Sequence, residues 1–151
     1  MTGKFGRTQL HIAARKQAVT AELVASAVKE GTINTKDNHG FTPLYHAAMF
    51  NDTAAIELLL ASGADIEMAD LGGLTPLHIA CEKGRPAAAV CLLKAGANHD
   101  AKDSINRTPL DWAVAKGHTE VQTAVEMHLE ASRGRLSSHP LSGTQAGGDR
   151  R

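Results

Sequence analysis

Apolar and polar positions follow the same order four times along the chain. A Thr, usually followed by Pro, opens a short run of Leu and Ala. Polar residues then interrupt the pattern before a second run of larger aliphatic residues. The first run occupies residues 40–48, 73–81 and 106–114, with a weaker copy at 6–14. Its threonines are 34, 33 and 33 residues apart, at Thr8, Thr42, Thr75 and Thr108. This period indicates a stack of small repeated units.

Each repeat predicts a pair of helices. Thr caps the first helix, and Pro at the first helical position lacks an N–H that would be unsatisfied there anyway. The Leu and Ala residues that follow give a small, closely packing face. The second helix carries the larger side chains, as in residues 56–60 and 90–93, and Gly63 or Gly96 follows its end. A polar turn then leads to the next Thr, through Asp37, Asp70 or Asp103.

The chain resembles the ankyrin-repeat family, whose period is near 33 and whose signature is Thr-Pro-Leu-His-x-Ala. The resemblance covers residues 3–131. It implies an all-α repeat solenoid of helix-turn-helix repeats joined by short β-hairpin-like turns. We expect four repeats in residues 1–132, at about 3–36, 37–69, 70–102 and 103–132. The signature residues are Thr8, His11, Thr42, Pro43, Thr75, Pro76, His78, Thr108 and Pro109.

The two end repeats depart from the pattern. The first has Gln9 in place of Pro and one extra residue, which makes its second helix, near residues 21–29, hard to place. The fourth puts Glu126 where earlier copies have Leu60 and Leu93. Because a terminal cap needs a polar outer face, we expect the array to end there. Residues 133–151 are rich in Gly, Ser, Pro and Arg and predict a polar, flexible tail.

Composition narrows the class of protein. Aromatic residues make up only 3% of the chain, so the core has to be built from Ala and aliphatic side chains. The formal net charge is zero, and we therefore expect no nucleic-acid partner. The start of the chain has no apolar signal core, and no apolar run is long enough to span a membrane. We expect an intracellular protein, cytoplasmic or nuclear.

The titratable residues do not form a reactive constellation. In the ankyrin family the signature histidine, here His11 and His78, ties the turn together by hydrogen bonds. Cys81 and Cys91 fall at positions that favour buried, unreactive thiols. Trp112 is expected to pack against the terminal cap. The sequence predicts neither an enzyme, nor a metal site, nor a cofactor.

The resemblance implies a partner site in the concave groove formed by the hairpin tips and the first helices. Large apolar residues at expected exposed positions are Phe41, Met49, Phe50, Leu71, Leu74 and Ile105. His39, Lys83, Arg107 and Lys116 are the polar members. An apolar cluster there favours binding, although Met49 or Phe50 could simply cover a helix-loop junction. The bases suggest a basic groove and an acidic back that would steer an acidic partner, although basic side chains can also merely solvate a groove.

We therefore expect a protein–protein interaction module: an adaptor, a scaffold or a small subunit of a larger assembly, monomeric on its own or held in a complex. The alternative is a small inhibitor that occupies a partner enzyme such as a protein kinase. Four repeats and a short tail are similar to the cyclin-dependent kinase inhibitors built from ankyrin repeats. Those inhibitors distort the first helix of their second repeat, whereas residues 42–48 look regular here. Residues 133–138 resemble a kinase site with Ser138 as acceptor, a match that is common by chance.

Overall fold

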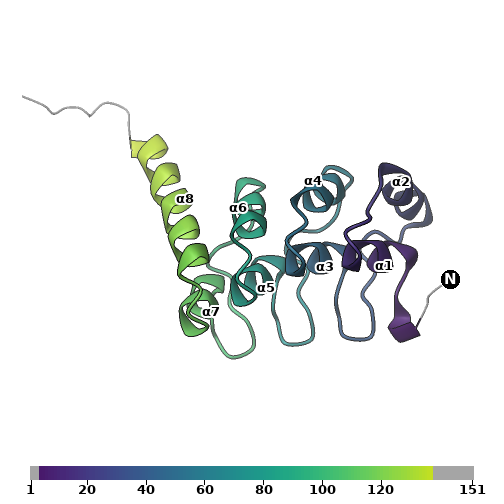
Figure 1. Cartoon of the computed structure of the whole chain (residues 1–151), viewed down its shortest axis with the longest axis horizontal. Coiled ribbons are helices and arrows are strands. Elements are labelled where there is room, and N and C mark those ends of the chain that lie inside the picture. The colour runs from purple at the N-terminus through teal and green to yellow at the C-terminus, as the bar shows by residue number, and fades with distance from the viewer. Residues whose placement is uncertain (1–3, 138–151) are drawn as a thin grey trace, which may run out of the picture.

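The structure is a computed structural model that describes residues 4–137, with eight α-helices stacked in pairs. Figure 1 shows two rows, with the hairpins extending from the lower one. The inner row consists of α1 (Gln9–Arg15), α3 (Pro43–Met49), α5 (Pro76–Glu82) and α7 (Pro109–Ala115). The outer row consists of α2 (Ala21–Glu30), α4 (Thr53–Ala61), α6 (Pro86–Lys94) and α8 (Thr119–Ser137). A short 3₁₀ turn, Lys4–Gly6, precedes them. The expected all-α repeat solenoid is confirmed.

The inner helices begin as the sequence predicts. In each of them the Thr side chain accepts the N–H of the third helical residue. His11 and His78 return a bond to the Thr backbone, and Asp111 does the same in α7. These reciprocal bonds satisfy donors that a helix start leaves open. Tyr45, at the signature position of the second repeat, has a different partner.

Small residues let the inner helices pack closely. Ala13, Ala47, Ala80 and Ala113 are buried at equivalent places in successive repeats, the last three of them completely. In α3 and α5, residues 43–48 and 76–81 are all buried. Leu59 and Leu92 of the outer row are completely covered as well. The core is therefore continuous along the stack, with each repeat covering the next.

The end repeats differ from their expected outlines. The second helix of repeat one forms as α2, where Thr20 caps its start and Gly31 ends it at φ 71°. The last helix continues to Ser137, five residues past the expected repeat boundary at 132. Ser138 and the rest of the expected tail lie outside the described residues.

At each junction a side chain of one repeat bonds the hairpin of the next repeat near its base. His11 bonds the Phe41 carbonyl through Nε2 at 2.8 Å, and His78 bonds the Arg107 carbonyl at 2.9 Å. Each imidazole Nδ1 accepts the N–H of the capping Thr, so Nε2 carries the proton and donates. Between repeats two and three the Tyr45 hydroxyl donates to Asp70 Oδ2 at 2.7 Å. The middle junction therefore uses a phenol in place of the imidazole.

Removing the phenolic hydroxyl tests this tie. We expect Tyr45→Phe to lower the free energy of unfolding by about 1–3 kcal/mol, because Asp70 loses a short bond from a buried donor. Urea unfolding followed by circular dichroism measures the change. The matched control is Ser26→Ala, which removes an exposed bond to Glu30 and should change stability little. Equal effects of the two substitutions would contradict the tie.

Candidate functional site

The residues that the sequence predicts for partner binding form two lines of side chains along the array, a hairpin row and a helix-end row. His39, Phe41, Leu71, Leu74, Ile105 and Arg107 belong to the hairpins. Met49, Phe50, Lys83 and Lys116 lie at the C-terminal ends of the inner helices. A helix of seven residues separates the rows by about 10 Å. Because α3 and α5 bury residues 43–48 and 76–81, the accessible side chains on the inner layer of the middle repeats come mainly from the hairpins and the helix ends.

Each hairpin is shaped by one aspartate. Asp37 Oδ1 accepts the N–H groups of His39 and Phe41 at 2.9 and 3.0 Å. Asp70 and Asp103 accept the equivalent pairs in their own hairpins. Gly40 and Gly73 sit at φ 82° and 80°, and an added Cβ would come within 2.9–3.0 Å of the next hairpin's backbone. The hairpins are thus pinned internally and packed against one another.

The expected exposure of the apolar residues holds in part. Leu71 is 80% exposed and Ile105 is 59% exposed. For Phe41, Met49, Phe50 and Leu74 the expectation is wrong, since all four are half-buried. Phe41 stacks on the Tyr45 ring with centroids 4.4 Å apart, and Met49 and Leu74 pack against the core. The most accessible apolar residues of this surface are therefore at the tips of the second and third hairpins, those of Asp70 and Asp103.

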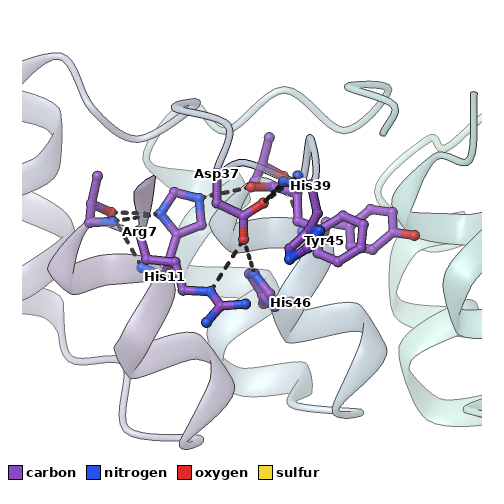
Figure 2. A network of polar contacts seen from close by, with 9 residues as sticks. Arg7, His11, Asp37, His39, Tyr45 and His46 are labelled. Atoms are coloured by element: carbon purple, nitrogen blue, oxygen red, sulfur yellow. Dashed lines mark hydrogen bonds and ion pairs between the residues drawn. The ribbon is translucent and has the colours of Figure 1, made fainter. Parts of the chain in front are cut away.

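Every hairpin aspartate also has a donor for its second oxygen. Asp37 Oδ2 receives Arg7 Nε at 3.4 Å and His46 Nε2 at 3.0 Å (Figure 2). Asp70 Oδ2 receives Tyr45 from the preceding repeat, and Asp103 Oδ2 receives Trp112 Nε1 at 2.7 Å. The sequence did not predict this bond of Trp112, and the packing of its ring against the terminal cap stays a prediction. Sequence reasoning missed the set, although His46 and Trp112 share a position that Ile12 and Ile79 occupy elsewhere.

The first junction buries two imidazole rings. His11 and His46 lie with ring centroids 5.7 Å apart and edge to face, and both are almost inaccessible. Because a carboxylate can only accept, His46 Nε2 carries the proton given to Asp37. His46 Nδ1 is then a buried acceptor without a partner among the described residues. Burial lowers the pKa of His46 to about 4 against the opposing pull of Asp37, and it lowers the pKa of His11 as well.

The Asp37 carboxyl is held in its charged form. Burial alone would raise its pKa, but the hydrogen bonds from His46, Phe41 and His39 outweigh burial and lower it. Arg7 adds an ion pair on the side of the first repeat. The network therefore combines a charged carboxylate with neutral imidazoles near neutral pH.

Acid should weaken this junction. The folded pKa of His46 lies below the unfolded value of 6.5, so the unfolded chain binds the proton first. The free energy of unfolding that depends on neutral His46 is fully present above about pH 6.5. It falls by at most about 3 kcal/mol as the pH is lowered toward 4. His46→Ile, which introduces the residue found at positions 12 and 79, should flatten the profile. Urea unfolding at a series of pH values measures it, and parallel profiles would refute the role of His46.

The helix-end row joins neighbouring repeats at the C-terminal ends of the inner helices. Gln17 donates to the Phe50 carbonyl at 2.7 Å, and Arg85 donates to the Met49 carbonyl at 2.9 Å. His118 bonds the Glu82 carbonyl at 2.9 Å. Lys83 and Lys116 are exposed C-cap residues of α5 and α7, where a positive charge favours the helix dipole. The Lys116 ammonium and the Arg107 guanidinium both lie over the Trp112 ring, at 5.8 and 4.8 Å from its centroid.

Charge differs between the two layers. The hairpins and inner-helix ends carry exposed or half-buried bases against one acid, half-buried Glu82 at the end of α5, and the hairpin aspartates are largely committed to hairpin bonds. These bases are Arg7, Arg15, Lys16, Lys36, Lys83, Arg85, Lys102, Arg107 and Lys116. The outer helices and the turns after them carry mainly acids, Glu22, Glu30, Glu57, Asp65, Glu67, Asp100, Glu120, Glu126 and Glu130, against Lys29, Lys94 and Arg133.

The thiols and acids of the described chain show no reactive arrangement. Cys81 is fully buried, and burial raises its pKa to about 12. Cys91 is half-buried, and its pKa is raised mainly by burial and also by the nearby Glu57 carboxylate. Among the described residues no cluster of three His, Cys, Asp or Glu side chains could hold a metal ion. None of the helices between residues 4 and 137 is long and apolar enough to cross a membrane.

Together the fold and the surface define a solenoid of helix pairs with pinned hairpins. A family model described as "Ankyrin repeats (3 copies)" matches residues 1–70 and 67–125. The chain therefore belongs to the ankyrin-repeat family, whose members are generally protein–protein interaction modules and typically non-catalytic. A search of the curated proteins found no match.

Proposed function

We propose that this chain is a non-catalytic module that binds a partner protein through its hairpin tips and inner-helix ends. It would act as an adaptor, a scaffold or a small subunit of a larger assembly. The observation that carries the proposal is the exposure of Leu71 and Ile105 on hairpins whose backbones are pinned by Asp70 and Asp103. Rigid presentation of apolar side chains lowers the entropic cost of binding.

The partner's contact surface would be apolar and acidic. Apolar groups would cover Leu71 and Ile105, and carboxylates would meet the bases of the helix-end row. Within residues 4–134, Arg15, Lys16, Lys83, Arg107 and Lys116 form no ion pair in the chain itself. Charges of this kind accelerate association and select partners more than they add affinity.

The cellular setting in this proposal is intracellular, in the cytoplasm or the nucleus. Cys81 and Cys91 are both free thiols, which suits a reducing compartment. An inhibitor of a partner enzyme remains the alternative role for the same surface. The regular helix α3, Pro43–Met49, gives no support to the specific likeness to kinase inhibitors, which distort the equivalent helix.

The apolar tips can be tested by purifying the endogenous complex. We expect the double variant Leu71→Ser/Ile105→Ser to lose the partner, because the buried apolar contact is removed without touching the core. The control is Val28→Ser/Met127→Ser, which changes two exposed apolar residues on the outer layer. Both variants should give the wild-type circular dichroism spectrum. Retention of the same partners by the hairpin variant would refute the proposed surface.

The charge contribution can be tested by association kinetics with the identified partner. We expect the association rate to fall steeply as salt rises, because steering acts through unscreened charge. Lys83→Glu/Lys116→Glu should slow association at low salt, whereas Lys29→Glu on α2 should have a smaller effect. A rate that does not depend on salt would exclude an acidic partner surface.

A further inference from the structure

The outer layer contains an apolar groove that the proposed hairpin surface does not use. It lies between α4 and α6, which are neighbours in the outer row (Figure 1), and has a volume of about 550 Å³. Leu60, Ala87, Val90 and Cys91 line it, with Glu57 and Lys94 beside them. Volumes of roughly 300–1,000 Å³ are typical of binding sites.

The two helices that form the groove lack the polar face that a solvent-facing helix normally carries. α4 has one charged residue, Glu57, and α6 has one, Lys94; the accessible positions otherwise hold mainly alanines, aliphatic residues and Cys91. The helices on either side are different, since α2 exposes Glu22, Ser26, Lys29 and Glu30. Because a helix that is apolar all round is normally buried, we expect the outer face of α4 and α6 to be covered by another chain.

Stacking of the repeats does not require an apolar side chain at Val90. Val90 is the counterpart, 33 residues on, of Glu57, and the next counterpart is Thr123 in α8. All three residues occupy the same place in an outer helix, so the fold accepts an acid, a hydroxyl or a valine there. The valine in α6 therefore makes the groove apolar without being needed for the core.

The charge around the groove limits what can fill it. Acids predominate on the flanking outer helices and turns, and Glu57 adds one at the groove itself. Lys94 is the base next to it. A segment with a basic polar side would therefore be attracted, and an acidic one would be repelled.

We propose that the groove between α4 and α6 binds an amphipathic helix of another protein, with its apolar side between the two helices and its basic side toward the surrounding acids. A row of side chains at helical spacing fits the furrow between two packed helices. The site is separate from the hairpin tips and does not depend on the function proposed for them.

Labelling of Cys91 by a maleimide provides the test on the full chain. The probe is a synthetic helix of Leu and Lys with one apolar face, and the same composition in scrambled order is its control. We expect the amphipathic peptide to slow labelling of half-buried Cys91, while fully buried Cys81 serves as the internal reference. The scrambled peptide should protect poorly, and an equivalent peptide of Leu and Glu should not protect.

Val90→Glu separates groove binding from simple charge attraction. It adds a negative charge, so a merely electrostatic association would tighten, whereas groove binding should weaken by about tenfold or more because a charge is placed in an apolar contact. Val90→Thr, the residue of α8, gives a milder second variant, and circular dichroism checks the fold of both. Leu71→Ser/Ile105→Ser should leave protection unchanged. Absence of protection in the wild type, or tighter binding by Val90→Glu, would overturn the proposal.

Discussion

The aspartate at the base of each hairpin uses its two carboxylate oxygens in different ways. Oδ1 of Asp37, Asp70 and Asp103 accepts two backbone N–H groups and so sets the shape of the hairpin. Oδ2 accepts a side chain: His46 and Arg7, Tyr45 or Trp112. Because hairpins pack tip against tip, the geometry of each one also depends on its neighbour. The surface that we propose for binding rests on these carboxylates.

The three junctions between repeats differ chemically although their backbones are alike. The first junction buries two imidazoles around a charged carboxylate. The second junction uses the Tyr45 phenol, and the third uses one imidazole, that of His78. In a linear stack, stability is a sum of repeat and junction terms. The first junction should therefore respond to acid more than the second, which has no buried imidazole tie.

The separation of charge gives the two faces different chemistry. A chain of zero net charge carries most of its accessible bases on hairpins and inner-helix ends and most of its acids on the outer layer. Two apolar features lie within this arrangement, the hairpin tips at Leu71 and Ile105 and the groove between α4 and α6. The two proposed surfaces would therefore receive different partners, an acidic one at the hairpins and a basic one at the groove.

The sequence by itself determined the local structure of each repeat. The period of 33, the Thr caps and the Thr-Pro-Leu-His pattern predicted the helix pairs, because capping and apolar spacing act within a few residues of each other. The roles of His11 and His78 as hydrogen-bonding residues came from the family resemblance. The exposure of Leu71 and Ile105 also came from the family resemblance, which places both residues at hairpin tips.

Only the tertiary structure decided which side chains are accessible and which polar groups meet. Phe41, placed by the pattern on a hairpin, turns inward onto Tyr45, and the Trp112 indole N–H donates to Asp103. The pairing of Tyr45 with Asp70 crosses 25 residues of sequence and depends on how two repeats stack. The same is true of the groove between α4 and α6, whose walls come from different repeats. A sequence period specifies what each repeat contains, but contacts between repeats depend on the angle and distance at which they pack.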